Sequence, residues 1–369
     1  MYTNEQYLER ESYEGTDDDD GDYTDPYRKY INKSSGYDLR NSSLLGNHKV
    51  TIGTDYTKEE QSIEADGVRV YDNTSIADVE YETDGGEIRN IGVYVEDEIE
   101  FDKLILTLGA RYDHYKLGGI YSGTFKQLSP KMKLRYQATD NLTLKSAYGR
   151  IFKGPALGET LMIKSSSTQG DDTSAQIGNN FEVGFDYSLA QALNADNSVF
   201  GMNIYRYNVD DYADTTKNST LDSQYDITIW GIESMFSYTK DDLGLNVSHT
   251  YIGGEQTDAD GIKTDPSKTQ IHTFNLGLNY QITSTLKVKY SGEFVPGDEY
   301  VKSSTSTVSR PGYGVHDINF ILKPSSLKDT TFNFGVDNIF DKEYTTHTAM
   351  ISDTHEVGRN FKFQVSYKF

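Results

Sequence analysis

Strand periodicity and the order of the connections predict an all-β chain that folds as an antiparallel transmembrane β-barrel. The last nine residues, FKFQVSYKF at 361–369, place apolar side chains at every second position and polar ones between them. Because successive residues of a strand point to opposite faces, this segment has one apolar and one polar face. Taken alone, it favours a soluble sandwich, which would bury the apolar face, over a barrel.

The same alternation recurs along most of the chain. Fifteen segments of roughly ten to twelve residues are predicted as strands, which matches the roughly 9–11 residues of a tilted strand that crosses a bilayer. They are 35–44, 48–56, 88–101, 104–115, 129–138, 142–152, 179–189, 198–209, 227–239, 243–254, 272–282, 286–294, 312–323, 330–340 and 358–369.

The connections between these segments alternate between long and short. Long links such as 57–87, 255–271 and 341–357 are each followed or preceded by short ones such as 102–103 and 240–242. A soluble sandwich has no reason for this order, whereas an outer-membrane barrel has short periplasmic turns and long external loops. The order therefore favours the barrel and places all long loops on one side of a membrane.

Composition excludes several classes of function. The formal net charge of −22 argues against nucleic-acid binding, which needs a basic patch. The absence of cysteine excludes disulfides, thiolate metal sites and a cysteine nucleophile. Twenty-nine tyrosines suit both strands and membrane–water interfaces. We find no nucleophile elbow, phosphate loop or H-E-x-x-H motif, so we predict no catalytic site and no enzyme.

The beginning of the chain differs from the rest. Residues 1–34 are polar and acidic and are predicted to be the remnant of an external loop, and residues 35–369 are predicted to form the barrel. The first residues have neither the basic nor the apolar region of a signal peptide. We therefore expect the sequence to begin inside a longer protein.

Several motifs resemble the C-terminal part of TonB-dependent outer-membrane receptors. The segment FKGPALGE resembles the family's FRAP-type motif, with Lys153 in place of arginine and Gly154 in place of alanine. The RPGYGVHD and FGVDNIFDKEY segments look most like the branch of haem and haem-protein receptors. The motif residues are Phe152, Lys153, Gly154, Pro155, Gly158 and Glu159, and the matching segments are 129–159, which contains the motif, 179–188, 310–324, 332–344 and 358–369.

The resemblance implies a fold and a function. The family has an N-terminal plug domain and a 22-stranded barrel, so this chain is similar to an incomplete barrel of about 15 strands without a plug. It implies active import of an iron-containing ligand across the outer membrane of a Gram-negative bacterium. Haem or a haem protein is the first expectation and a ferric siderophore the second. The alternative is a passive porin-like channel or surface adhesin on the same barrel.

The resemblance also implies partners. These are the TonB energy-coupling complex, which acts through the plug, the barrel assembly machinery, and the lipid and lipopolysaccharide of the outer membrane. No intrinsic cofactor and no metal site are assigned. Because an open sheet leaves unpaired edges in lipid, we expect that this chain alone does not make a working transporter.

Two histidines are candidate ligand-binding residues. His347 and His355 fall in the last external loop, and imidazole is a common axial ligand of haem iron. Solvated loop residues are the alternative interpretation. In the haem branch a ligand histidine lies in the loop after the FRAP-type motif, but 161–178 contains none, which leaves a siderophore or another metal chelate open.

Strand alternation assigns faces to other polar residues. His249 and His316 share the parity of lipid-facing residues and are interpreted as interfacial. Tyr367 and Phe369 end an aromatic strand that resembles the assembly signal of outer-membrane barrels. Six basic residues are predicted to face the lumen, either to attract an anionic ligand or to pair with Glu182, Asp186, Glu233 and Glu293. They are Arg111, Lys145, Lys287, Lys289, Lys362 and Lys368.

Overall fold

The structure is a computed structural model, and it describes most of the chain from residue 2 to residue 369. The described residues are 2–10, 13–17, 21–25, 27–66, 68–71, 75–78, 81–119, 122–157, 174–213, 224–258, 260–266, 269, 271–303, 306–349 and 355–369. Most of them lie in antiparallel strands or in the turns between strands. Within these ranges, no helix is long and apolar enough to cross a membrane.

One large sheet contains sixteen long strands, and each pairs with its neighbours in chain order. They are β1 (Tyr2–Arg10), β4 (Tyr27–Leu45), β5 (His48–Asp66), β8 (Tyr81–Phe101), β9 (Leu104–Gly118), β10 (Gly123–Gln137), β11 (Leu142–Lys153), β12 (Gln176–Ser188), β13 (Asn197–Ala213), β14 (Gln224–Lys240), β15 (Leu243–Thr257), β17 (His272–Gln281), β18 (Leu286–Val295), β21 (Tyr313–Leu322), β22 (Thr330–Asp337) and β23 (Asn360–Tyr367).

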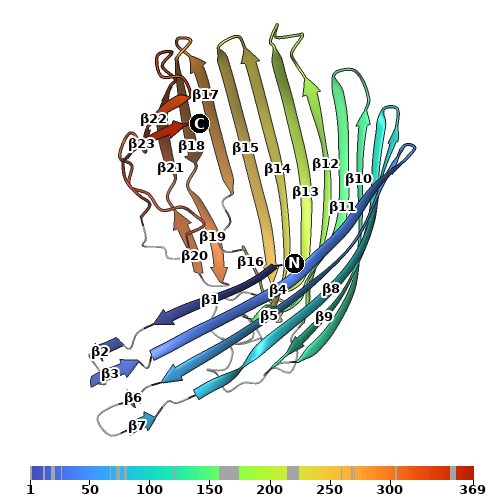
Figure 1. The fold of residues 1–369 in the computed structure, drawn as a ribbon. Coiled ribbons are helices and arrows are strands. Elements are labelled where there is room, and N and C mark those ends of the chain that lie inside the picture. Colours follow the sequence, from blue (N-terminus) through green and yellow to red (C-terminus); the bar gives the residue numbers. More distant parts are fainter. Residues whose placement is uncertain are drawn as a thin grey trace.

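Short strands decorate one end of this sheet (Figure 1). The short strand β16 (Lys263–Thr264) pairs with the end of β15 and so extends the sheet there. Three separate hairpins lie in the long connections. They are β2 (Tyr13–Asp17) with β3 (Gly21–Asp25), β6 (Val68–Tyr71) with β7 (Ser75–Asp78), and β19 (Asp298–Ser303) with β20 (Ser306–Arg310).

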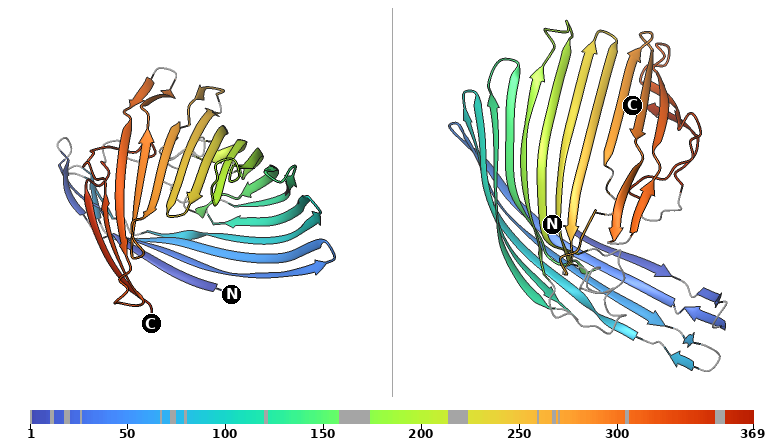
Figure 2. Two further views of the ribbon diagram at one scale, coloured as in Figure 1. Left: turned by 90° about the horizontal axis from the view of Figure 1, so that it is seen from above. Right: turned by 180° about the vertical axis from the view of Figure 1, so that it is seen from behind.

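The sheet curls into an open trough and does not close into a complete barrel. Figure 2 shows this curvature from above, with the first and last strands at the two edges. In the residue register, β1 pairs with β4 and β23 pairs with β22. Among the described residues, neither edge strand has a second long partner in this register.

The fifteen predicted strands are confirmed, and the prediction of a loop over residues 1–34 is wrong in its secondary structure. Tyr2–Arg10 forms β1, which pairs with β4 from Tyr2 opposite Gly36 to Arg10 opposite Arg28. The segment YTNEQYLER shows no apolar alternation, but backbone hydrogen bonds between strands do not require an apolar face. That residues 1–34 belong to an external loop stays a prediction.

Several strands are longer than predicted at the end opposite the short turns. β5 has 19 residues and β8 has 21. The link predicted as long at 116–128 shrinks to four residues, 119–122, because β9 and β10 continue toward each other. The prediction stopped where the apolar alternation stops, whereas backbone pairing continues through polar sequence.

Short turns gather at one end of the sheet, at the top of Figure 1. The two-residue turns use backbone conformations with positive φ, including Gly46 (φ 66°), Asp102 (φ 44°) and Asp241 (φ 49°). Glycine and aspartate tolerate this region best, and such turns match the twist of a hairpin. The residues at these positions therefore favour the short connections that the sequence predicts.

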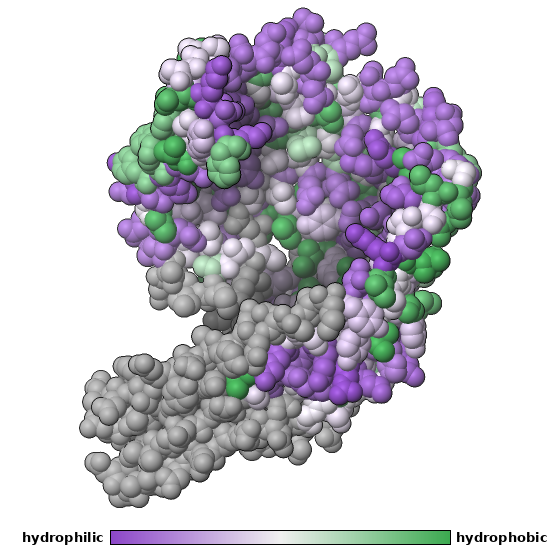
Figure 3. Space-filling view, viewed as in Figure 1, coloured by the Kyte–Doolittle hydropathy of each residue, from purple (hydrophilic) through white to green (hydrophobic). Residues whose placement is uncertain are grey.

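The two faces of the sheet differ as the alternation predicts. On β12, Phe181 and Val183 point outward and are 54% and 57% exposed, and Glu182 between them points inward. Aromatic rings on neighbouring strands contact one another on the outer face, as with Tyr148 and Phe181, whose ring centroids lie 4.7 Å apart. Figure 3 shows hydrophobic side chains along the outer edge of the sheet and hydrophilic ones over the short-turn end. Exposed apolar residues on this scale fit a lipid-facing surface.

Two histidines with lipid-facing parity lie on this outer face, as predicted. The His249 ring stacks on Phe274 at 4.3 Å, and its Nε2 lies 3.1 Å from Nδ1 of His272. His316 Nδ1 lies 2.6 Å from the Tyr290 hydroxyl, and its ring meets the edge of Phe340. Their position at the membrane interface stays a prediction.

One small apolar core lies on the inner face near the long-loop end. Ile88, Tyr115, Leu117 and Leu157 are buried there. The chain after β11 folds back onto this core, and the Tyr115 hydroxyl donates a hydrogen bond to the carbonyl oxygen of Pro155. This contact fixes the start of the connection between β11 and β12.

Candidate functional site

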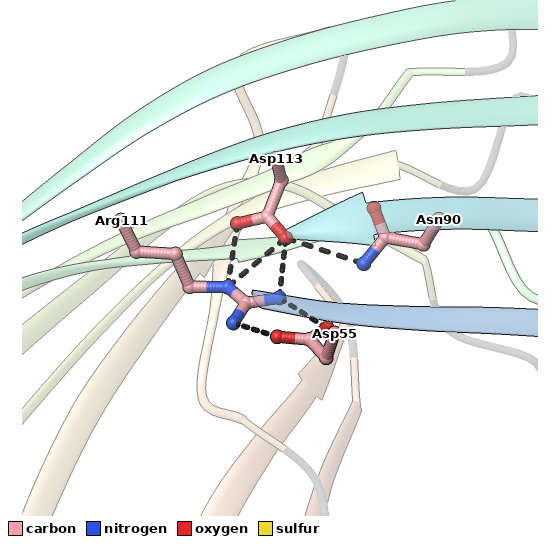
Figure 4. Close-up of polar contacts among 4 residues, drawn as sticks. All are labelled: Asp55, Asn90, Arg111 and Asp113. Carbon is pink, nitrogen blue, oxygen red and sulfur yellow. Dashed lines mark hydrogen bonds and ion pairs between the residues drawn. The ribbon is translucent and has the colours of Figure 1, made fainter. Parts of the chain in front are cut away.

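The inner wall of the sheet carries a charged network centred on Arg111 of β9 (Figure 4). Its Nη1 donates to Asp55 Oδ2 at 2.6 Å, and its Nη2 donates to Asp55 Oδ1 at 2.9 Å. The same guanidinium donates to Asp113 through Nε and Nη2, at 2.9 and 2.7 Å. Asn90 Nδ2 also donates to Asp113 Oδ1 at 3.2 Å. One cation thus satisfies two carboxylates from different strands, and we call these four residues the inner-wall network.

The strand register explains why the network forms. Asp55 of β5, Gly92 of β8 and Asp113 of β9 stand opposite one another in one row across the sheet. A side chain at Gly92 would collide with the Arg111 guanidinium. The glycine therefore opens a path for Arg111 to cross β8 and reach Asp55. Bidentate pairing of this kind favours arginine over lysine.

The same arrangement recurs along the inner wall. Lys131 of β10 passes over Gly109 of β9 and forms an ion pair with Glu96 of β8. Tyr205 of β13 passes over Gly231 of β14. In each case a glycine faces a long side chain on the neighbouring strand. At these positions the long side chains thus lie along the inner wall, over the glycines of the neighbouring strands.

A polar hollow of about 580 Å³ lies on the inner wall toward the short-turn end. Three cations and three carboxylates line it beside aliphatic side chains, so it offers both charged and apolar contacts. Its lining is Glu98, Ile105, Thr107, Lys133, Leu134, Arg135, Lys145, Ser146, Ala147, Glu182, Asn203 and Glu233.

Contacts in the structure show the surroundings of four of the six cations that are predicted to face the lumen. Lys145 pairs with Asp186 at 2.7 Å, and Asp186 is one of the four carboxylates predicted as partners. Arg111 faces inward as predicted, but its partners are Asp55 and Asp113 and not a predicted carboxylate. Two others lie near aspartates that the sequence did not single out. Lys362 pairs with Asp337, and Lys289 lines a smaller hollow of about 260 Å³ that also contains Asp337. For Lys287 and Lys368, orientation rests on alternation alone.

His347 is buried in the packing between two long connections. It is 7% exposed, and its Nε2 donates to the carbonyl oxygen of Pro311 at 3.0 Å. Its Nδ1 lies 3.5 Å from Asp298 Oδ2 but makes no hydrogen bond. Asp298 is itself held by Arg310, whose Nε and Nη2 donate to it at 2.7 and 2.8 Å. His347 thus joins the β19–β20 hairpin to the connection after β22.

An aromatic stack continues this packing. The Tyr313 and Tyr344 rings lie 4.6 Å apart, and the Tyr313 hydroxyl donates to Glu293 at 3.0 Å. Burial, and then the nearby Glu356 carboxylate, raise the pKa of the Tyr344 phenol above its usual value. Tyr344 therefore remains a neutral ring at physiological pH.

His355 differs from His347 in exposure. Its side chain is 55% exposed, and its Nδ1 lies 3.5 Å from Glu343 Oε1. The structure therefore does not bring the two predicted ligand residues into the same environment. His355 is open to an approaching ligand as it stands, whereas His347 needs this loop packing to open. Among the described residues, no three His, Asp or Glu side chains gather as a metal site would.

Comparison with known families decides the assignment. A family model described as TonB dependent receptor-like, beta-barrel matches residues 2–339. This chain belongs to the TonB-dependent receptor β-barrel family. Proteins of this family lie in the outer membrane of Gram-negative bacteria, so the exposed apolar face of the sheet faces lipid.

Two curated relatives carry names that refer to haem. The Heme/hemopexin utilization protein C of Haemophilus influenzae is 24% identical over 381 residues, covering 90% of this chain and 50% of that protein. The TonB-dependent heme receptor A of the same species is 21% identical, covering 92% and 52%. The chain thus spans about half the length of the curated relatives it matches.

Solved structures share the fold. The Copper transporter OprC has a TM-score of 0.77 at 18% identity, covering 93% of this chain and 57% of that chain. The FrpB iron transporter of Neisseria meningitidis has a TM-score of 0.73 at 18% identity, covering all of this chain and 64% of that one. At this identity the likeness concerns the fold alone.

The receptor family's FRAP-type segment lies at the end of β11. Phe152 and Lys153 finish the strand, and Gly154 and Pro155 turn onto the inner core. The Tyr115 ring would lie 2.5–2.6 Å from a Cβ at Gly154. Gly158 and Glu159 lie outside the described residues. A functional role for the segment stays a prediction.

We predict that Gly154→Ala destabilises the complete receptor, meaning the product of the whole reading frame that contains residues 1–369. The added methyl group collides with a buried ring that is also hydrogen-bonded, and overpacking of this kind costs about 1–3 kcal/mol. Gly149→Ala is the matched control on the same strand, because nothing lies within 4 Å of its Cβ position. Urea unfolding of purified receptor in detergent micelles measures both. Equal midpoints for the two variants would contradict the prediction.

The terminal strand keeps its predicted form. Tyr367 ends β23 and is 63% exposed, and Phe369 lies two residues beyond it, fully exposed. β23 pairs with β22 through its whole length. Recognition of these residues by the barrel assembly machinery stays a prediction.

Sequence reasoning singled out Arg111 but missed its three partners in the inner-wall network, Asp55, Asn90 and Asp113. Asp55 and Asn90 lie in polar stretches where many carboxylates and amides were equally plausible. No signal in the sequence alone identifies them, because the register that sets Asp55, Gly92 and Asp113 in one row, with room for the Arg111 side chain at Gly92, exists only in the folded sheet.

Proposed function

We propose that this chain is part of the barrel wall of an active-transport receptor that imports an iron-containing ligand, first of all haem or a haem protein. TonB drives the import by acting on a plug domain inside the complete barrel. The observation that carries the proposal is the similarity over about nine-tenths of the chain to proteins named for haem and hemopexin utilization and for haem reception. A ferric siderophore is the second candidate ligand.

The geometry of the inner wall supports a transport route that runs along this face of the sheet. Carboxylate partners hold the side chains of Arg111 and Lys131 against the sheet, and the neighbouring glycines leave room for them there. A wall of paired charges offers water-filled surroundings to a polar plug or a hydrated ligand without presenting one strong binding charge.

The long connections supply the proposed ligand surface. His355 is exposed and offers an imidazole nitrogen for haem iron. His347 holds the β19–β20 hairpin against the last long connection and would bind a ligand only after these loops separate. We therefore assign His355 the first contact and His347 the fixing of the loops.

A passive porin-like channel or an adhesin is the alternative on the same barrel. It differs in energy dependence, because a channel passes its solute without TonB. The complete receptor is therefore expressed in a bacterium that cannot make haem and lacks its own haem receptor, with and without a working TonB protein.

We expect growth on haem only when the complete receptor and TonB are both present. Growth that persists without TonB would support the passive channel. Absence of growth on haem, with TonB-dependent growth of a siderophore-deficient strain on ferric siderophores, would select the second ligand. His355→Ala is expected to weaken haem binding to purified receptor about tenfold, as for loss of one metal-binding interaction. Unchanged haem absorbance and affinity would remove His355 from the site.

A further inference from the structure

Two histidine rings on the outer face of the sheet turn a nitrogen toward each other. His249 of β15 stands opposite Phe274, and His272 precedes Phe274 by two residues on β17. The two histidines therefore lie on a diagonal across neighbouring strands. His249 Nε2 lies 3.1 Å from His272 Nδ1, and the ring planes differ by only 13°. The ring centroids are 5.4 Å apart, so the nitrogens meet at the edges of the rings.

Aromatic neighbours hold both rings in this orientation. The His249 ring stacks on Phe274 with 4.3 Å between centroids, and the His272 ring lies 5.0 Å from the Tyr251 ring. Both histidines are half-buried. Side chains whose rotamers are fixed by packing lose little conformational freedom when they bind a ligand. The two nitrogens are thus held close together before a ligand arrives.

The distance between the two nitrogens suits a shared metal ion as well as a hydrogen bond. Imidazole nitrogens bind Zn²⁺ at about 2.0–2.1 Å, and two nitrogens at this separation then subtend an angle of about 100° at one ion. That angle lies between the right angle of a tetragonal Cu²⁺ site and the wider angle of a tetrahedral Zn²⁺ site. Two imidazoles supply half of a four-coordinate shell, and water supplies the other half.

The pair lies where water and ions reach the barrel. His272 is nine residues before Gln281, where β17 ends at a short turn. A tilted strand needs about 9–11 residues to cross the hydrocarbon core. With the short turns on the periplasmic side, His272 lies at the external edge of the apolar band. The net charge of −22 attracts cations toward the protein from the external water.

We propose that His249 and His272 form a binding site for a divalent transition-metal ion, with Cu²⁺ bound more tightly than Zn²⁺. Without the ion, an N–H of one imidazole donates to the facing nitrogen of the other. When the ion binds, this proton moves to the far nitrogen of the same ring, and both facing nitrogens coordinate the metal. Cu²⁺ leads the affinity order of divalent metals at nitrogen sites. The site is independent of the imported ligand and of TonB.

A bound ion fastens the base of the connection between β15 and β17. Beside the pair, the backbone N–H of Ile252 donates to the carbonyl oxygen of Ile271 at 2.9 Å. An ion that binds only the folded state raises stability by mass action. We therefore expect Cu²⁺ to raise the urea midpoint of the complete receptor, and a chelator to reverse the rise.

Titration of the purified complete receptor with Cu²⁺ tests the proposal. We expect the wild type to bind one more ion per chain than the double variant His249→Ala with His272→Ala. Each single variant is expected to bind this ion at least about tenfold more weakly. The difference in electron paramagnetic resonance between the wild type and the double variant should show two imidazole nitrogens on copper. Binding is expected to weaken at lower pH, because protons compete for the nitrogens.

His316→Ala is the matched control. His316 lies on the same outer face, but its Nδ1 lies 2.6 Å from the Tyr290 hydroxyl. We expect this variant to bind Cu²⁺ as the wild type does. Heat-modifiable migration on gels confirms that each variant is folded, and the double variant His249→Gln with His272→Gln repeats the test with side chains that still form hydrogen bonds.

Two results would overturn the proposal. One is equal Cu²⁺ stoichiometry and affinity in the wild type and in the folded double variants, because the histidine pair would then bind no ion. The other is a difference spectrum with a single imidazole nitrogen, because the ion would then be held by one histidine and not by the pair.

Discussion

Arg111→Ala is expected to destabilise the complete receptor by about 2–4 kcal/mol. Breaking a buried ion pair costs about 3–5 kcal/mol because it leaves an uncompensated buried charge. Asp113 is only 4% exposed and would lose its strongest partner, whereas the Arg111 side chain is about one-third exposed, which lowers the expected cost. Urea unfolding in detergent micelles, followed by tryptophan fluorescence or gel migration, measures the change.

Controls separate charge from shape. Arg111→Lys keeps the charge but loses the bidentate geometry to Asp55, so we expect an intermediate loss of about 1–2 kcal/mol. Arg111→Met combined with Asp55→Asn and Asp113→Asn removes all three charges together and is expected to recover most of the stability. If the free energy of unfolding of the triple variant is no higher than that of Arg111→Ala, then Arg111 does not stabilise the receptor by neutralising Asp55 and Asp113.

Val183→Lys is expected to impair assembly more than any inward substitution of the same kind. Val183 points outward near the middle of β12, between Ser146 of β11 and Ile204 of β13. A lysine at the bilayer midplane on the lipid face of a barrel costs about 2–4 kcal/mol. We expect a lower amount of folded receptor in the outer membrane and a lower unfolding midpoint in lipid vesicles.

Ala147→Lys is the matched control for this substitution. Ala147 lies on the neighbouring strand β11, faces the inner hollow and stands opposite Glu182. The new lysine remains in water beside a carboxylate, so we expect a change within about 0.5 kcal/mol. Equal losses at the two positions would show that the two faces of the sheet do not meet lipid and water as assigned.

The sequence predicts the strands well because each lipid-crossing segment must alternate. Every predicted strand appears with its centre in place, since one apolar face and one polar face leave a period of two in the residues. The ends were underestimated where the pattern stops, as in the polar stretch Lys58–Glu59–Glu60 of β5. β1 was missed for the same reason, because its strand form depends on pairing with β4 and not on its own alternation.

The site is less accessible to prediction than the fold. Alternation placed Arg111, Lys145 and Asp186 on the inner face, but it could not select partners, because these depend on register between strands far apart in sequence. The burial of His347 depends on packing between two long connections, which carry no periodic pattern. Burial and pairing at such positions are properties of tertiary structure alone.

Single-cysteine labelling in whole cells tests most directly that the chain is a barrel wall with long loops outside. The chain contains no cysteine, so each introduced one is unique within it. Asp260 lies in the long connection between β15 and β17, and Asp242 lies in the short turn between β14 and β15. We predict that a membrane-impermeant maleimide labels Asp260→Cys on intact cells and labels Asp242→Cys only after the outer membrane is opened. Labelling of Asp242→Cys on intact cells, with Asp260→Cys protected, would contradict the assigned topology.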